Sequence, residues 1–182
     1  MEEKKILRKQ IREKKKEYSL EEKQQMSFPI FEQIERTTEF IKSKTVLLYW
    51  SMDDEVYTHD FVNKWYKEKT VLLPCVQGDD LLLRKYEGMA SMVKGEQFGI
   101  LEPAGKIFSD YDSIDLMIIP GVAFDKNKNR MGRGRGFYDR LLKLCKAPKV
   151  GICFDFQLSE NIPTEEFDVK MDMIVSSSSM IK

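Results

Sequence analysis

The stretch from Asn129 to Leu142 holds the residues whose types and spacing could do chemistry together. Three glycines alternate with two arginines just before a helical pattern, in the order Gly132, Arg133, Gly134, Arg135 and Gly136. Glycines allow positive φ and close approach, so several backbone N–H groups can face one anion. The helix N-terminus and the arginines add positive charge. The segment is typical of a polyphosphate cradle, and a flexible turn with solvated arginines is the alternative.

The spacing of these glycines excludes two familiar phosphate-binding loops. A Walker A loop needs the pattern GxxxxGK[ST], which occurs nowhere in the chain, and the dinucleotide fingerprint GxGxxG differs from the GxGxG found here. His59 is the only histidine, so the chain has no Ser-His-Asp triad, and a histidine-based zinc site is disfavoured. We expect His59 to lie on the surface near the start of a helix.

The elements that must position this segment alternate between helices and strands. We predict helices over residues 2–16, from the capping box Ser19-x-x-Glu22 onward, from Thr58 to Tyr66, and over residues 136–145. We predict buried strands over residues 45–50, 71–76, 81–86, 116–120, 149–154 and 173–176, the last of which ends the chain. Residues 88–111 are the least periodic, and we expect them to wrap over a site as loop.

This alternation predicts an α/β sandwich, Rossmann-like, with a largely parallel central sheet flanked by helices. Ligands of such sheets bind beyond the carboxyl ends of the strands. No linker divides the chain, so we expect a single domain over residues 1–182.

Two helices carry further expectations. Ile6, Leu7 and Ile11 predict an apolar stripe on the first helix, whereas Lys9 and residues 14–16 are expected to be solvated. In the second helix we expect Pro29 to cause a kink or a restart. The apolar positions that this helix is expected to bury are Met26, Ile30, Ile34 and Ile41.

Composition limits the partners and the compartment. Thirty basic residues balance thirty acidic ones, so no net field attracts nucleic acid or an anionic membrane. The start MEEKKILRK has no secretory pattern, and the three cysteines, expected in the core, form no CxxC pair. The longest apolar run, residues 114–124, is far too short to span a bilayer. We therefore expect a cytoplasmic protein.

Two linked motifs give the sequence its resemblance to a known family. The run Pro120-Gly121-Val122-Ala123-Phe124-Asp125 precedes Arg130-Met131-Gly132-x-Gly134-x-Gly136-Phe137-Tyr138-Asp139-Arg140. Together they resemble the signature of the 5-formyltetrahydrofolate cyclo-ligases, also called 5,10-methenyltetrahydrofolate synthetases. Further pieces agree along nearly the whole chain, namely Lys4-x-x-x-Arg8, Tyr49-x-Ser51 with Glu55 and Thr58, Leu73-Pro74, Phe98-Gly99-Ile100-x-Glu102-Pro103, and Asp168-x-x-x-Asp172.

The resemblance implies an ATP- and Mg²⁺-dependent cyclisation of 5-formyltetrahydrofolate, with or without a polyglutamyl tail, to 5,10-methenyltetrahydrofolate. In this reaction the formyl oxygen attacks the γ-phosphate of ATP, N10 closes the ring, and ADP and phosphate are released. The family also implies a monomer, with no nucleic-acid or membrane partner.

The resemblance also implies site residues. Lys4 and Arg8 share one helix face and are expected to reach the nucleotide phosphates, although spacing alone would suggest a solvated basic face. Arg135 and Tyr138 are expected to be catalytic and to contact the nucleotide. The remaining nucleotide contacts are expected at Arg130, Gly132, Arg133, Gly134, Gly136 and Phe137.

Two carboxylates are expected at the magnesium ion, Asp139 one turn into the helix after the loop and Asp172 just before the last strand. A helix-cap interaction and a surface ion pair are their alternatives. Glu102 is either a pocket residue or a loop anchor. The substrate is expected to contact Trp50, Met52, Glu55 and Tyr138, with Phe98 and Phe154 as further walls, and ordinary core positions are the alternative for the aromatic residues.

The chain departs from the family pattern at two positions. Lys128 stands where the family usually has glycine, and because a neighbouring asparagine tolerates the left-handed conformation, the turn can shift by one residue. Phe137 stands where the family more often has tyrosine. Three other classes stay open: a non-catalytic folate- and nucleotide-binding relative, an RNA-binding module suggested by the basic first helix and the GRGRGFYDR run, and an isomerase-like or acyl-carrier transferase enzyme on a similar scaffold.

Overall fold

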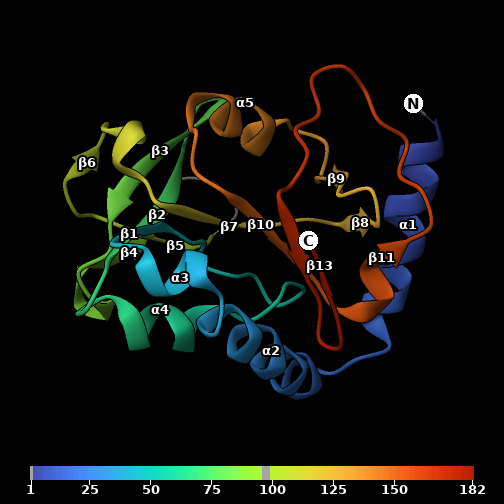
Figure 1. Ribbon diagram of the computed structural model, residues 1–182, viewed down its shortest axis with the longest axis horizontal. Helices are drawn as coiled ribbons and strands as arrows, with labels where there is room; N and C mark the ends of the chain where they lie inside the picture. The colour runs from blue at the N-terminus through green and yellow to red at the C-terminus, as the bar shows by residue number, and fades with distance from the viewer. Residues whose placement is uncertain (1, 96–98) are drawn as a thin grey trace.

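An eight-stranded sheet runs through the computed structural model, which describes residues 2–95 and 99–182 (Figure 1). Its strand order is β13-β12-β10-β7-β1-β2-β3-β6. Neighbours are parallel from β12 to β2, and the pairings of β13, β3 and β6 are antiparallel. The predicted α/β fold with a largely parallel sheet is confirmed. The bounds are β1 Thr45–Leu47, β2 Thr70–Gln77, β3 Asp80–Lys85, β6 Ile107–Phe108, β7 Leu116–Pro120, β10 Lys149–Ile152, β12 Met173–Val175 and β13 Met180–Ile181.

Helices cover both faces of this sheet. One face carries α2 (Leu20–Glu35), α3 (Thr38–Lys42) and α4 (His59–Trp65), and the other carries α5 (Phe137–Leu144) (Figure 1). Successive side chains of a strand point to opposite faces. Ile118 therefore joins the core beneath α2 to α4, whereas Met117 and Ile119 join the core beneath α5. This double burial explains why β7 is continuously apolar.

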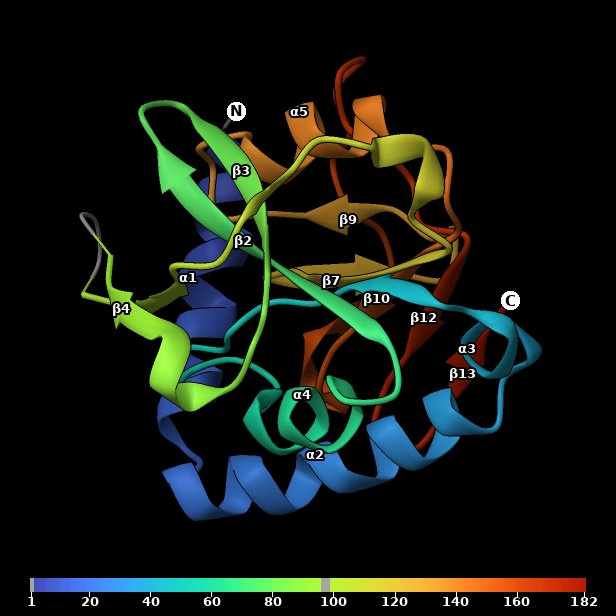
Figure 2. The same cartoon turned by 90° about the vertical axis from the view of Figure 1, so that its left-hand side faces the viewer.

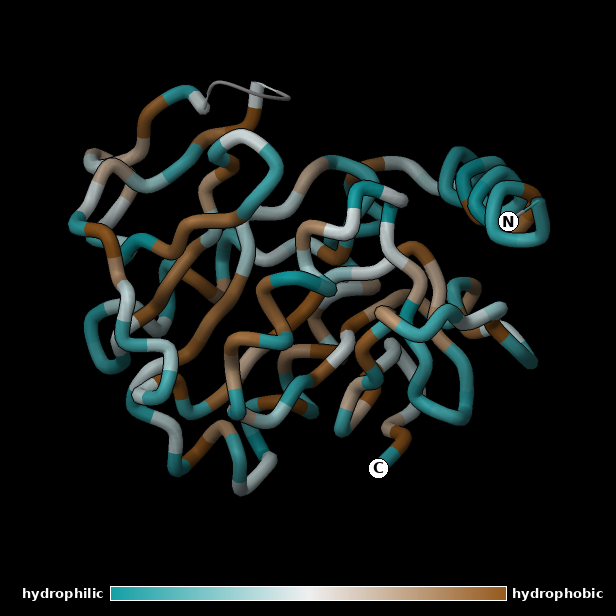
Figure 3. The backbone as a smooth tube through the Cα atoms, turned by 90° about the horizontal axis from the view of Figure 1, so that it is seen from above, coloured by the Kyte–Doolittle hydropathy of each residue, from teal (hydrophilic) through white to brown (hydrophobic). Residues whose placement is uncertain are grey.

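Helix α1 (Glu2–Lys16) lies at one side of the molecule, and most of its residues are hydrophilic (Figure 3). Ile11 and Leu7 pack there on a small cluster of their own. Ile6 is 51% exposed, so its predicted place in the apolar stripe is wrong. The partners of α1 include a three-stranded sheet of order β11-β8-β9, formed by β11 Leu158–Ser159, β8 Ala123–Asp125 and β9 Arg130–Met131.

Helix α2 begins at the predicted capping box. The Ser19 hydroxyl accepts from the Glu22 amide at 3.1 Å, and the Glu22 carboxylate accepts from the Ser19 amide at 2.7 Å. Pro29 lies inside the helix, and the chain restarts later, at the N-cap Thr37 of α3. Ile41 consequently falls on the separate helix α3 and is 65% exposed, so its predicted burial is wrong.

Several predicted boundaries need correction. The segment of residues 88–111 contains β4 (Met92–Lys94) and β5 (Leu101–Pro103), which pair as an antiparallel hairpin beside the β2–β3 hairpin (Figure 2). The chain ends with β13 rather than β12. Short 3-10 turns complete the described elements, at Met89–Ser91, Tyr111–Ser113 and Asp155–Gln157. The three cysteines are buried thiols, as predicted. In the described ranges, no helix has the length and apolar character to cross a membrane.

The turn between β8 and β9 is organised by the buried carboxylate of Asp125. Its Oδ1 accepts from the amides of Asn127 at 2.9 Å and Asn129 at 3.0 Å, and its Oδ2 accepts from the Ile162 amide at 3.0 Å. Lys128 itself adopts the left-handed conformation, with φ of 64°. The expected shift of the turn onto an asparagine is therefore wrong, because the Asp125 contacts fix the register.

The left-handed backbone at Lys128 predicts that Lys128→Gly stabilises the protein. A residue with Cβ is strained there and glycine is not, so we expect a gain of about 1 kcal/mol in the free energy of unfolding. Urea unfolding measures it. Lys126→Gly is the matched control: Lys126 has no positive φ, and its replacement should lower stability. Equal destabilisation by both changes would contradict the prediction.

Candidate active site

The parallel strands reverse their order between β1 and β7, because β2 lies on one side of β1 and β7 on the other. Loops that leave such neighbouring strands in opposite directions open a crevice at their carboxyl ends. A cavity of about 380 Å³ lies at this edge of the sheet, as predicted. Its lining includes most of the predicted site residues, namely Trp50, Met52, Glu55, Arg130, Gly132, Arg133, Arg135, Gly136, Phe137, Tyr138 and Asp139.

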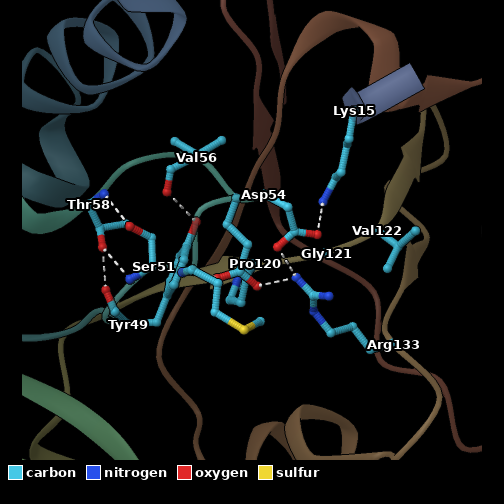
Figure 4. A network of polar contacts seen from close by, with 12 residues as sticks. Lys15, Tyr49, Ser51, Asp54, Val56, Thr58, Pro120, Gly121, Val122 and Arg133 are labelled. Carbon is cyan, nitrogen blue, oxygen red and sulfur yellow. Dashed lines mark hydrogen bonds and ion pairs between the residues drawn. The ribbon is translucent and has the colours of Figure 1, made fainter. Parts of the chain in front are cut away.

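The loop after β1 is held by a pair of reciprocal hydrogen bonds. The Ser51 amide donates to the Thr58 hydroxyl at 3.1 Å, and the Thr58 amide donates to the Ser51 hydroxyl at 3.0 Å (Figure 4). The Thr58 hydroxyl donates to the Tyr49 carbonyl, so it does not cap α4 as predicted. Glu55 is fixed within this loop, because its Oε2 accepts from the Met52 amide at 3.0 Å.

The glycine-rich loop on the opposite side of the cavity uses its glycines for backbone conformation. Gly134 and Gly136 have φ of 107° and 69°, and Gly136 is the residue from which α5 starts. Arg8 of α1 lies against this loop, and its Nε donates to the Gly132 carbonyl at 2.9 Å. The predicted neighbourhood of Arg8 and the glycines is therefore present, with Arg8 outside the lining of the main cavity.

Arg133 joins the two loops across the cavity. Its Nη2 donates to Asp54 Oδ1 at 2.6 Å and to Glu55 Oε1 at 3.1 Å. Asp54 also accepts from Lys15 Nζ at 3.3 Å, so two cations flank this carboxylate (Figure 4). Lys15 has a side chain only 6% exposed, and its predicted solvation is wrong. Its spacing of eleven residues from Lys4 equals about three helical turns and could have indicated a shared face.

Burial and charge act on these groups in opposite directions. Burial raises the pKa of the Glu55 carboxyl despite the neighbouring Arg133. Burial would also raise the pKa of Asp54, but Lys15 and Arg133 together lower it below its usual value. Burial lowers the pKa of Lys15, and Asp54 opposes this only in part. Asp54 is therefore the firmly ionised member of the acidic pair.

Arg130 ties the end of β7 to the start of α5. Its Nη1 donates to the Pro120 carbonyl at 3.0 Å, and its Nη2 lies 3.3 Å from Asp139 Oδ1. The guanidinium also lies 5.5 Å from the centre of the Tyr138 ring. Burial raises the pKa of the Tyr138 phenol well above its usual value, with Glu55 adding to the shift. Tyr138 is thus a neutral hydroxyl on the cavity wall.

The remaining arginine of the loop, Arg135, packs on an aromatic ring. Its guanidinium lies 5.6 Å from the Phe137 ring centre, and the Arg140 guanidinium lies at the same distance. Arg140 is anchored by Asp80 at 3.0 Å and by the Arg135 carbonyl at 3.1 Å. These contacts place a cation at the cavity mouth beside the first turn of α5.

Besides Arg8 and Gly134, two further predicted site residues lie outside the lining of the cavity. Lys4 Nζ contacts Glu165 Oε2 and Asp168 Oδ2, each at 2.7 Å. Burial would lower the pKa of Lys4, but these two carboxylates raise it. Asp172 accepts from the Lys149 amide at 2.8 Å, beside the first residue of β10. Since the cavity lies where the parallel strands end, the structure does not bring Asp172 to Asp139.

The other residues predicted to form walls of the site fall into two groups. Trp50 and Met52 line the cavity, whereas Phe154 is fully buried in the core, as its alternative stated. Glu102 lines the cavity and accepts from the Val76 amide at 3.0 Å, so it anchors β5 to β2. Phe98 lies outside the described residues.

The fold and the site together define an α/β protein whose glycine- and arginine-rich loop faces a cavity at the carboxyl edge of its sheet. The chain belongs to the 5-formyltetrahydrofolate cyclo-ligase family, whose model matches residues 1–177. The resemblance expected from the motifs is thereby confirmed. Membership favours a cyclo-ligase over the RNA-binding and isomerase-like alternatives.

Individual relatives agree with this assignment. A 5-formyltetrahydrofolate cyclo-ligase of Haemophilus influenzae is 36% identical over 144 residues, which cover 74% of this chain and 76% of the relative. The solved structure of Aquifex aeolicus 5,10-methenyltetrahydrofolate synthetase superposes with a TM-score of 0.87 at 35% identity, covering 97% of this chain and 91% of that one. The solved structure of a 5,10-methenyltetrahydrofolate synthetase from Mycoplasma pneumoniae superposes with a TM-score of 0.77 at 28% identity. The match covers 94% of this chain and 97% of that one.

The Lys15–Asp54 contact predicts an asymmetry between single and double variants. Asp54→Asn leaves the buried Lys15 ammonium without its carboxylate, and we expect a loss of about 2 kcal/mol in the free energy of unfolding. Adding Lys15→Met removes that charge and should restore most of the loss. Urea unfolding of both single variants and the double variant measures the coupling. Additive losses would show that Lys15 does not depend on Asp54.

Proposed function

We propose that this protein converts 5-formyltetrahydrofolate to 5,10-methenyltetrahydrofolate with cleavage of ATP to ADP and phosphate. The observation that carries the proposal is the joint lining of one cavity by the glycine-rich loop and by the loop after β1. A phosphoryl donor on the first loop and a folate on the second would face each other there. Family membership supports the same reaction.

The folate is proposed to bind on the β1 side of the cavity. Trp50 and Met52 supply apolar walls, and Glu55 supplies a carboxylate held by the Met52 amide and by Arg133. A pterin is a flat ring with N–H donors, so a carboxylate between apolar surfaces suits it. A polyglutamyl tail would extend this substrate outward, and we propose that tailed and untailed folates are both accepted.

ATP is proposed to bind with its phosphates at the glycine-rich loop. Backbone N–H groups of the loop and the N-terminus of α5 would face the phosphates, and Arg8 and Arg135 would add positive charge. Lys4 and Arg133 are further proposed phosphate contacts, and in this structure both are paired with carboxylates. Binding through them would require exchange of those carboxylates for phosphate oxygens.

The proposed chemistry is phosphoryl transfer followed by ring closure. The formyl oxygen attacks the γ-phosphorus, the bond to ADP breaks, and an imidate-like phosphate forms. N10 then attacks the formyl carbon and loses its proton, after which phosphate leaves with the formyl oxygen. Arg135 is proposed to stabilise charge that develops on the transferring group. The neutral hydroxyl of Tyr138 is proposed to donate a hydrogen bond there.

Magnesium is proposed to accompany ATP. Mg²⁺ prefers one or two carboxylates with phosphate oxygens and water, and it would neutralise phosphate charge. Asp139 fits this role, since it lines the cavity on the first turn of α5 with a side chain 13% exposed. Among the described residues, no cluster of three or more acidic, histidine or cysteine side chains offers a protein-only cage.

The remaining proposals concern the domain organisation, the compartment, the oligomeric state and the partners of the protein. The contact of Arg8 with Gly132 joins the first helix to the C-terminal half of the site, which supports one domain over residues 1–182. We propose that the protein is a cytoplasmic monomer. We also propose that it has no nucleic-acid partner, since its basic and acidic residues balance.

An absorbance assay of the methenyl chromophore tests the proposed function and the role of Arg135. With 5-formyltetrahydrofolate, ATP and Mg²⁺ the chromophore should grow, and omission of ATP should abolish it. Arg135→Ala should lower kcat about 100-fold while folate binding persists, because a charge aimed at the transition state is lost.

Arg36→Ala, at the exposed C-cap of α2, is the matched control and should retain full activity. Absence of chromophore growth in the folded parent protein would favour the non-catalytic relative instead. Near-normal turnover of Arg135→Ala would remove this residue from the reaction.

The two predicted carboxylates give a paired test of the metal site. Asp139→Asn weakens the proposed Mg²⁺ ligand, so half-maximal activity should require a higher Mg²⁺ concentration. Asp172→Asn should leave the Mg²⁺ titration unchanged, because Asp172 lies at the opposite edge of the sheet. An unchanged titration for Asp139→Asn would exclude Asp139 as a ligand.

A further inference from the structure

His59, expected on the surface, is half-buried against the aromatic wall of the cavity. Its imidazole lies 3.8 Å from the Trp50 ring centre with an interplanar angle of 10°. Its Nε2 lies 3.0 Å from the Ser51 carbonyl oxygen. A carbonyl oxygen only accepts, so Nε2 carries the hydrogen and donates. The ring is therefore fixed both in position and in its plane.

Trp50 depends on neighbours for its orientation. It lines the cavity from the loop after β1, and its indole N–H donates no hydrogen bond to any described residue. Tyr86 also stacks on it, with ring centres 5.8 Å apart and an interplanar angle of 27°. Tyr86 is in turn anchored by its hydroxyl, which donates to Asn63 at 2.6 Å. Of the two rings, the imidazole is closer and more nearly parallel.

We propose that His59 is a positioning residue that fixes the Trp50 indole as a wall of the substrate cavity, by stacking on it while donating from Nε2 to the Ser51 carbonyl. The substrate role of this wall rests on the proposed function. Ser51 belongs to the reciprocal pair with Thr58, so the imidazole links the wall to a point of this loop that hydrogen bonds hold. Loss of the imidazole should weaken folate binding without touching the nucleotide loop.

The stack also makes this wall sensitive to acid. The groups facing His59 are the carboxylates of Asp53 and Asp60 and the Tyr57 ring, 4.7 Å away. Burial lowers the pKa of His59, and the Ser51 contact and both carboxylates oppose this only in part. A histidine with a lowered pKa keeps its stabilising effect above its unfolded value of about 6.5. That effect is lost as pH falls from there through the folded pKa.

Fluorescence of the ligand-free protein tests the stack directly. The chain has two tryptophans, so Trp65→Phe leaves Trp50 as the only indole. An imidazolium stacked on an indole quenches its emission, so Trp50 emission should fall on acidification with a midpoint below about 6.5. His59→Gln keeps a planar hydrogen-bond donor but cannot titrate, and it should abolish this transition. A transition that persists in His59→Gln, or emission independent of pH in the parent, would overturn the stack.

Kinetics test the positioning role. His59→Ala should raise KM for 5-formyltetrahydrofolate about fivefold, the change expected for one stacked aromatic pair, with kcat and KM for ATP unchanged. His59→Gln should recover part of the affinity at neutral pH. Equal effects on both substrates, or an unchanged folate KM, would overturn the role.

Thermal melts of each variant show whether it is folded. If His59→Ala does not fold, the folate KM of His59→Gln is measured in its place. If the folded parent turned over no folate at all, the proposed function would fail, whereas the fluorescence titration would still decide the stack.

Discussion

The paired contact of Arg133 with Asp54 and Glu55 is the interaction on which the site depends. It spans 79 and 78 residues of sequence and joins the loops on the two sides of the strand-order reversal. Two unit charges 4 Å apart attract by about 4 kcal/mol near a protein surface, while burying each ion costs several kcal/mol. These terms nearly cancel, so the main effect of the contact is to set the distance between the loops. The opposite pKa shifts of Asp54 and Glu55 reflect the same balance.

The pairing also determines where positive charge remains for an anion. Lys15 and Arg133 are matched by Asp54 and Glu55, so this cluster adds no net charge. Lys4 is likewise matched by Glu165 and Asp168. The field at the glycine-rich loop is then provided by the N-terminus of α5 with Arg8 near it. A chain with no net charge can thus present a local anion site, because its acids pair with Lys4, Lys15 and Arg133, whereas Arg8 contacts the carbonyl of Gly132.

The sequence predicted elements whose signals are local. The apolar run of β7 and the reciprocal Ser19–Glu22 cap were located to the residue because burial on both faces and capping act over a few positions. The strands β8, β9 and β11 were missed, since two or three residues show no period. The Arg133 partners and the place of Asp172 depend on loop packing and strand register. Asp172 precedes β12, and only the pairing of β12 in the sheet shows at which end of the parallel strands Asp172 lies.

Phe137, which departs from the family pattern, still offers an aromatic ring to the neighbouring arginines. The guanidinium groups of Arg135 and Arg140 each lie 5.6 Å from the centre of its ring. Cations interact with the face of an aromatic ring, which phenylalanine and tyrosine both provide. Arg140 is held by Asp80 and by the Arg135 carbonyl, so the ring packs within a fixed frame. The contacts with Arg135 and Arg140 thus use the aromatic ring at position 137, and a hydroxyl is not needed for them.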